Sequence, residues 1–329
     1  MTIELVGVIG GGAWGTALAQ VAASGGRETL LWAREPEVVE GVNRRHENGL
    51  FLAGIPLHHA VRATEDLGEL RECDAILVVT PAQHTRAVLS GTGLRGKPLI
   101  LCAKGMEEAT TKLMHDVARE EQPESPIAVL SGPTFAHEVA AGLPAAVTLA
   151  VEDREVGESI RNRLARPFFR PYLSDDVIGA EIGGAVKNVL AIACGVVEGR
   201  GLGQNARAAL ISRGFAEMTR FGLARGARAE TLAGLSGLGD LVLTCSSTSS
   251  RNFSLGKGLG EGWAAAELLA DRRTVAEGAY TAPVLNRAAH EAGVDMPIVA
   301  AVCALLSGEA SVDEILERLL SRPLRSEGV

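Results

Sequence analysis

The chain has 329 residues and a formal net charge of −8, from 32 basic and 40 acidic residues. At about 150 residues per domain this length predicts two domains, and 47% hydrophobic residues supply enough apolar surface for a core in each. This composition excludes extended disorder, and the acidic balance provides no broad basic field for nucleic acid, so any bound anion must be held locally.

The sequence carries no signal for export, membrane insertion or metal binding. The longest uncharged apolar stretch, Val139–Val151, falls short of the roughly 18 residues that span a bilayer. The N-terminus enters an apolar run without a basic leader or a cleavage site. The five cysteines stand singly, and His137-Glu138 is followed by Ala141 where a second zinc ligand would stand. We therefore expect a cytoplasmic protein with reduced cysteines, no bound metal, no membrane insertion and no nucleic-acid partner.

The first half alternates short apolar runs with stretches of helical spacing, which predicts parallel βαβ units. The expected strands are Leu5–Ile9, Thr29–Trp32, Ala75–Thr80, Leu99–Ala103, Ile127–Leu130 and Ala146–Val151. The expected helices are Thr16–Ala23, Gln83–Leu89, Thr110–Glu120 and Arg154–Ala165.

The second half lacks convincing strands, and its apolar residues recur at helical spacing from Ile178 to Leu320. Ser174-Asp175-Asp176 is suited to cap the first of these helices. The sequence therefore predicts an α/β protein: an N-terminal Rossmann domain, doubly wound on a mostly parallel sheet (residues 1–176), and an all-α domain for substrate binding and catalysis (residues 177–329).

A glycine-rich turn follows the first expected strand. Gly10-x-Gly12-x-x-Gly15 lies between that strand and a helix that begins with small residues, the context that a dinucleotide fingerprint requires. Gly10 permits a tight turn, Gly12 lets the backbone approach a pyrophosphate, and Gly15 lets the helix lie close to the strand. The alternative is an ordinary glycine-rich turn.

The second expected strand ends in Arg34, where NAD-specific sites place an acidic residue for the ribose hydroxyl. A guanidinium suits a 2′-phosphate or stacking on adenine, so we expect NADPH to be accepted at least as well as NADH. The alternative is a solvated surface arginine beside Glu35.

Two strand-end loops carry polar groups to the edge where ligands bind in open α/β sheets. Lys104 directly follows the strand Leu99–Ala103, and the segment from Ser131 to Ala136 offers backbone N–H groups and the Thr134 hydroxyl. Each alone is an ordinary loop, but together they predict one pocket.

Two segments of the helical half also look unsuited to simple packing. Lys187 interrupts an apolar helix beside glycines that let another group come close; the alternative is a snorkelling lysine. Asp240 lies among glycines, and Arg251 with its amide and hydroxyl neighbours is suited to clamp a phosphate. The alternative for this second segment is an exposed flexible loop.

Taken in order, the blocks GGGAWGTALA, LWAR, PAQHTRAVL, KGMEE, SGPTFAHEVA, EIGGAVKNVLAIACG, GLSGLGDLVLTC, SSRN and VAEGAYTA resemble the NAD(P)-dependent glycerol-3-phosphate dehydrogenase family of the bacterial type, over nearly the whole chain. The resemblance implies Lys187 as the proton acceptor, with Lys104 and Asp240 beside it. It implies substrate contacts from Lys104, Gly132, Thr134, Lys187, Asp240, Ser250, Arg251 and Asn252. It implies cofactor contacts, besides Gly10, Gly12 and Gly15 of the turn, from Ala13, Trp14, Arg34, Phe51, Lys104, Ala136, Arg251, Val275 and Glu277.

Two positions depart from the family pattern: Ala13 stands where serine is more usual, and Thr134 where serine is commoner. The implied reaction is hydride transfer between NAD(P)H and dihydroxyacetone phosphate, giving sn-glycerol 3-phosphate for phospholipid synthesis by a homodimer. Two alternatives stay open: a two-domain hydroxy-acid dehydrogenase of the hydroxyisobutyrate or 6-phosphogluconate type, and a sensor that binds NADPH without turnover.

Overall fold

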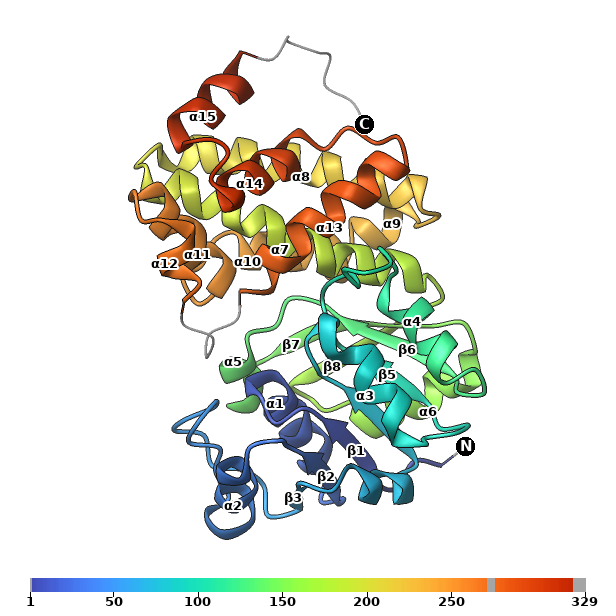
Figure 1. Cartoon of the computed structure of the whole chain (residues 1–329). Helices are drawn as coiled ribbons and strands as arrows, with labels where there is room; N and C mark the ends of the chain where they lie inside the picture. The colour runs from blue at the N-terminus through green and yellow to red at the C-terminus, as the bar shows by residue number, and fades with distance from the viewer. Residues whose placement is uncertain (1, 271–275, 322–329) are drawn as a thin grey trace. The chain divides into compact units, whose positions relative to one another are not determined.

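The computed structural model describes residues 2–270 and 276–321. It divides into two compact units (Figure 1). Residues up to 103 together with 114–180 form the first unit, and residues 104–113 together with those from 181 onward form the second. The expected boundary lay at residues 176–177, whereas the units part between Ala180 and Glu181. The chain also passes into the second unit and back at residues 104–113, where both side chains and backbone carbonyls of the segment bond to partners in that unit.

The first unit is built on one eight-stranded sheet with the order β3-β2-β1-β4-β5-β6-β7-β8. Every neighbouring pair is parallel except β6 and β7. The strands are β1 (Val6–Ile9), β2 (Thr29–Trp32), β3 (Val61–Thr64), β4 (Ala75–Val78), β5 (Leu99–Leu101), β6 (Ile127–Ser131), β7 (Ala145–Val151) and β8 (Phe169–Ser174). The prediction of a doubly wound, mostly parallel sheet is confirmed.

Helices cover both faces of this sheet, so its central strands are buried on both sides. Val8 of β1 packs in one apolar cluster and its neighbour Ile9 packs in the other, as the alternation of side chains along a strand requires. The helices are α1 (Ala13–Ala23), α2 (Pro36–Arg45), α3 (Thr85–Thr92), α4 (Met114–Glu121), α5 (Ala136–Ala140) and α6 (Arg154–Leu164).

The sequence analysis missed two strands, β3 and β8, and two helices, α2 and α5. Both strands lie at the edges of the sheet, where one side of the strand makes no ladder hydrogen bonds. An edge position tolerates Arg62, which is exposed in β3, and Pro171, which is buried in β8 but lacks an N–H for the ladder. These residues hid the strand pattern. The helix expected from Thr110 begins only at Met114.

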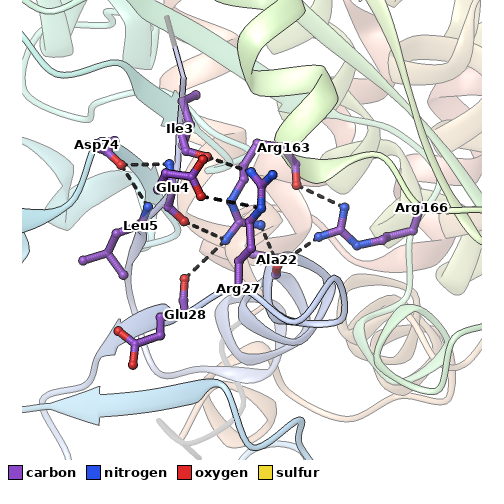
Figure 2. A network of polar contacts seen from close by, with 9 residues as sticks. All are labelled: Ile3, Glu4, Leu5, Ala22, Arg27, Glu28, Asp74, Arg163 and Arg166. Carbon is purple, nitrogen blue, oxygen red and sulfur yellow. Dashed lines mark hydrogen bonds and ion pairs between the residues drawn. The ribbon is translucent and has the colours of Figure 1, made fainter.

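An arginine clamp fastens α6 to the end of α1 (Figure 2). The buried Arg163 donates from Nη1 to the Ala22 carbonyl at 2.6 Å, and Arg166 donates to the same carbonyl at 3.0 Å. Positive charge beside the C-terminal carbonyls of a helix complements the helix dipole. The clamp therefore holds α1 at the end opposite to its glycine-rich start.

The described part of the second unit contains helices and turns but no strand, which confirms the predicted all-helical half. Its helices are α7 (Val177–Gly199), α8 (Gly203–Ala224), α9 (Ala229–Leu232), α10 (Asp240–Thr244), α11 (Arg251–Gly260), α12 (Ala265–Leu268), α13 (Glu277–Glu291), α14 (Pro297–Ser307) and α15 (Val312–Leu320), with a π-helical turn at Leu235–Gly239. The start of α7, which the chain reaches while still in the first unit, is capped as expected, because Asp176 Oδ1 accepts from the Gly179 N–H at 2.8 Å.

The core of the second unit is the long apolar helix α7. Among the described residues it is the one helix long and apolar enough to cross a membrane, but 94% of its most apolar 18-residue stretch is buried inside the protein. It is therefore a core helix.

Candidate active site

The glycine turn of the first unit has the geometry of an anion cradle. Gly10 has a φ of +124°, and a Cβ on Gly15 would lie 1.8 Å from the Gly10 carbonyl oxygen, so α1 starts closer to β1 than any side chain permits. Gly12 is the N-cap of α1 and has no atom within 4 Å of where a Cβ would stand. No acidic residue and no side-chain cap occupies this helix start, so its free N–H groups suit a pyrophosphate.

The apolar cofactor contacts that the resemblance implies gather around this turn. Ala13, Trp14, Phe51 and Ala136 are half-buried, and all four pack against the same apolar cluster. Trp14 Nε1 is a buried donor that finds no acceptor among the described residues. A cradle of free N–H groups beside half-buried apolar side chains fits a dinucleotide.

Arg34 follows β2, as expected, and its side chain is 81% exposed. Its Nη2 lies 2.9 Å from Glu35 Oε1, and Nε donates to the same oxygen at 3.2 Å. The guanidinium is therefore accessible to a ligand, but a neighbouring carboxylate competes for it.

The loop after β6 also ends at the carboxyl edge of the sheet. Gly132 is buried against β7, and the half-buried Thr134 donates from Oγ1 to the Gly132 carbonyl at 3.2 Å. This bond holds the hydroxyl inside its own loop.

The second unit brings Lys104, Lys187 and Asp240 into one polar cluster. Lys104 Nζ lies 2.6 Å from Asp240 Oδ2, and Lys187 Nζ lies 2.8 Å from Asp240 Oδ1. Asp240 is fully buried, and the two lysine side chains are only 13% and 8% exposed. Residues that are distant in the sequence thus share one carboxylate.

Close backbone packing positions this cluster. A Cβ on Gly183 of α7 would lie 2.3 Å from the Ser236 carbonyl oxygen, so only glycine lets the π-helical turn before Asp240 approach α7. This confirms that a glycine beside Lys187 admits another group. Asn188 donates from Nδ2 to the Lys104 carbonyl at 3.3 Å, which ties residues 104–113 to the same helix.

Burial sets the electrostatics of the cluster. The pKa of Lys187 is lowered to about 8, chiefly by desolvation; Asp240 acts to raise it, and Lys104 acts to lower it. Burial alone would raise the pKa of Asp240, but the two ammonium groups outweigh it and lower that pKa. The net effect is a carboxylate that stays charged beside a lysine whose proton is labile near neutral pH.

Thr244 belongs to this cluster and was missed by the sequence analysis. Its buried Oγ1 accepts from Lys187 Nζ at 2.8 Å and donates to Asp240 Oδ1 at 3.1 Å. Asp240 and Thr244 are four residues apart on α10, so their side chains share one face of the helix. This i, i+4 spacing was the available signal, but a single threonine in an apolar run is more often a packing residue.

The remaining contacts implied by the resemblance lie at the starts of α11 and α13. Ser250 caps α11 by accepting from the Phe253 N–H at 3.2 Å, and the exposed Arg251 is the first residue of that helix. The Asn252 Oδ1 accepts from the Gly278 N–H at 2.9 Å, which joins the two helix starts. Burial raises the pKa of Glu277, while Arg251, Lys104 and Lys187 act to lower it. Val275 lies outside the described residues.

The comparisons with known proteins agree on one family. Residues 5–157 match the profile of the NAD-dependent glycerol-3-phosphate dehydrogenase N-terminus, and residues 176–317 match that of its C-terminus. The chain belongs to the NAD-dependent glycerol-3-phosphate dehydrogenase family. A glycerol-3-phosphate dehydrogenase [NAD(P)+] of Erythrobacter litoralis is 64% identical over 99% of this chain and 98% of its own length. One from Novosphingobium aromaticivorans is also 64% identical, over 99% of each chain.

A solved structure supports the same assignment. The glycerol-3-phosphate dehydrogenase of Coxiella burnetii superposes with a TM-score of 0.91 at 36% identity, covering 97% of this chain and 99% of its own. The predicted family resemblance and enzyme class are thus confirmed. The hydroxy-acid dehydrogenase alternative is not favoured, since both matching family profiles and the relatives at 64% identity are glycerol-3-phosphate dehydrogenases.

Proposed function

We propose that this family member catalyses reversible hydride transfer between NAD(P)H and dihydroxyacetone phosphate, which gives sn-glycerol 3-phosphate. The observation that carries the proposal is the buried Lys104–Asp240–Lys187 cluster. A pure dinucleotide sensor has no need for a lysine of lowered pKa beside a second cation. The substrate is inferred from the names of the relatives, each a glycerol-3-phosphate dehydrogenase.

Proton handling falls to Lys187. When bound, the nicotinamide supplies the hydride. In the reducing direction Lys187 Nζ donates a proton to the oxygen on C2 of the substrate, and Lys104 Nζ polarises that carbonyl. The ammonium of Lys187 has three N–H bonds, of which two are directed to Asp240 and Thr244, which leaves one for the substrate oxygen.

The substrate phosphate is assigned to the start of α11, where Arg251 is exposed and Ser250 and Asn252 stand beside it. The Asn252 oxygen is already occupied by Gly278, so its Nδ2 group is the donor left for phosphate, and the Ser250 hydroxyl retains its own proton. Gly132 and Thr134 are proposed as further substrate contacts. Under this proposal residues 1–176 mainly hold the dinucleotide, and residues 177–329 mainly bind and convert the substrate. The exceptions are the substrate contacts Lys104, Gly132 and Thr134 in the first stretch and the cofactor contacts Arg251, Val275 and Glu277 in the second.

The dinucleotide is assigned to the glycine turn with Ala13, Trp14, Phe51 and Ala136, and at its ribose to Arg34. Without a carboxylate at the Arg34 position, we propose that NADPH is used at least as well as NADH. We also propose that the enzyme works in the cytoplasm as a homodimer and supplies glycerol phosphate for phospholipid synthesis, all of which rests on the family resemblance. Light scattering of the purified enzyme tests the dimer, which a monomer mass would contradict.

The deciding experiment is turnover, followed by the loss of reduced-nicotinamide absorbance. The substrates are dihydroxyacetone phosphate, unphosphorylated dihydroxyacetone, and oxo acids, among them the aldehyde acid that is the oxidised partner of 3-hydroxyisobutyrate, each with NADPH and NADH. We expect rapid turnover of dihydroxyacetone phosphate alone. Preferred turnover of an oxo acid would support a hydroxy-acid dehydrogenase, and NADPH binding without any turnover would support a sensor.

A further inference from the structure

Beneath the glycine turn lies a buried side-chain amide that no step of the proposed reaction uses. Asn48 follows α2, far from the turn in the sequence, and is fully buried. Its Nδ2 group donates to the Gly11 carbonyl at 2.8 Å and to Thr16 Oγ1 at 2.8 Å. Its Oδ1 accepts from the Phe51 N–H at 3.1 Å. Both N–H bonds of the amide and its oxygen are therefore engaged.

The first of these bonds determines how the turn presents its N–H groups. In a trans peptide the carbonyl and the following N–H point in opposite directions. Because Asn48 and Thr16 both donate to the Gly11 carbonyl, the Gly12 N–H points away from Asn48. No described residue accepts from the Gly12 N–H, so it remains available to an anion beside the first turn of α1.

The other end of the amide orders a second cofactor-contacting segment. The Asn48 side-chain oxygen accepts from the Phe51 N–H, and the Asn48 backbone carbonyl accepts from the Leu52 N–H at 2.9 Å. Together these bonds close the loop that carries Phe51. One side chain thus sets the positions of the glycine turn and of the Phe51 loop. Without it, each segment would have to be ordered when the ligand binds, at a cost to affinity.

We propose that Asn48 is a positioning residue for dinucleotide binding, which holds the glycine turn and the Phe51 loop in their binding geometry without contacting the cofactor. The proposal rests on the proposed function, because it assumes that a dinucleotide binds this turn. It makes a claim that is separate from the role of Arg34. Asn48 acts on the part of the site that NADPH and NADH share, so it should affect both cofactors equally.

The test compares Asn48→Ala with Asn43→Ala. Asn43 provides a matched control: its amide donates to the Ala63 carbonyl at 2.9 Å and accepts from the Ala63 N–H at 2.8 Å, in the same unit but away from the turn. For each variant we would measure the Kd of NADPH and NADH by nicotinamide fluorescence, kcat and the KM of dihydroxyacetone phosphate at saturating cofactor, and the Tm without ligand.

For Asn48→Ala we expect the Kd of both cofactors to rise at least about fivefold, with their ratio unchanged and with kcat and the substrate KM within about twofold of wild type. Asn43→Ala should lower the Tm and leave both Kd values unchanged. An unchanged Kd in Asn48→Ala, or an equal rise in Asn43→Ala, would overturn the inference.

If Asn48→Ala does not fold, Thr16→Val decides in the same assay: a raised Kd for both cofactors supports the inference, and an unchanged Kd overturns it. Failure of the wild type to bind NADPH would instead defeat the proposed function.

Discussion

Lys187 is expected to make the reaction depend on pH in opposite senses in the two directions. Its pKa is lowered to about 8, chiefly by burial. Reduction needs the protonated lysine in the free enzyme, so kcat/KM for dihydroxyacetone phosphate should fall above about pH 8. Oxidation needs the neutral amine, so kcat/KM for glycerol 3-phosphate should fall below about pH 8. Lys187→Ala should lose both limbs, and its kcat should be about 10²–10⁴ lower. Near-normal kcat in this variant would make Lys187 a packing residue.

Thr244 is expected to hold Lys187 in register with Asp240. Thr244→Val keeps the shape of the side chain but removes the hydroxyl that both partners use. We expect kcat to fall about ten- to hundredfold through misplacement of the amine, with the Kd of NADPH unchanged. Thr219→Val is the control, because the Thr219 hydroxyl bonds, within the described part of the chain, only to the Phe215 carbonyl one turn earlier in α8. Equal losses of kcat in the two variants would show a general effect of removing a buried hydroxyl.

Arg34 is expected to favour NADPH, since its exposed guanidinium is free to pair with a 2′-phosphate once Glu35 is displaced. Arg34→Ala should raise the KM of NADPH far more than that of NADH. Glu35→Gln should have the opposite effect and lower the KM of NADPH, because it removes the competing carboxylate. Equal changes for both cofactors would leave Arg34 as a general adenine contact.

At the scale of elements, the sequence predicted the interior of the sheet better than its edges. β1 and β4 are wholly buried and therefore read as unbroken apolar runs, while the edge strands β3 and β8 carry arginine and proline. The candidate site divides in the same way. Local context singled out Lys187 and Asp240, but their pairing is a tertiary contact that no local pattern encodes. Asn48 and Thr244 were missed because each is a single polar residue with one partner nearby and a deciding partner far away in the sequence, Gly11 for Asn48 and Lys187 for Thr244.

The junction of α8 and α14 should make stability depend on pH. The buried Glu217 of α8 accepts from the Ile298 N–H at 2.8 Å and the Val299 N–H at 3.3 Å, and so replaces a side-chain cap at the start of α14. Burial raises its pKa from 4.5 to about 7, although the two backbone bonds oppose the shift. Between about pH 4.5 and about pH 7 the folded chain therefore binds more protons than the unfolded chain. The free energy of unfolding should fall by about 3 kcal/mol as pH rises through this range.

Urea unfolding of the wild type and Glu217→Gln at about pH 5 and about pH 8 measures this effect. The variant should gain stability relative to the wild type as pH rises, because glutamine carries no charge to bury. Glu314→Gln is the control: hydrogen bonds from Ser311 lower the pKa of the exposed Glu314, so its contribution is lost only below the range tested. A constant difference between Glu217→Gln and the wild type would show that Glu217 does not titrate in this window.

At the scale of the whole molecule, residues 104–113 belong to one unit although both flanking segments belong to the other. Bonds among the described residues tie this segment to the rest of the second unit. Lys104 pairs with Asp240, Asn188 donates to the Lys104 carbonyl, Thr111 donates to Glu291 of α13 at 3.1 Å, and Arg287 of α13 donates to the Glu108 carbonyl. A sequence-based boundary treats a domain as one continuous stretch, so it assigned Lys104 to the dinucleotide domain.

This connectivity predicts how the chain opens locally, since stability is distributed over cooperative units rather than along the sequence. Asp240→Asn removes the carboxylate that two buried lysines share, and one uncompensated buried charge costs about 3–5 kcal/mol. Hydrogen exchange followed by mass spectrometry should then show faster exchange in residues 104–113 together with α7 and α13, while β5 and β6 on either side of the segment keep their protection.

Asn43→Ala, which loosens α2 from β3, should accelerate exchange in the first unit and leave residues 104–113 unchanged. If residues 104–113 instead follow β5 and β6 in both variants, the segment opens with the sheet, and its bonds to Asp240 and α13 do not determine its stability.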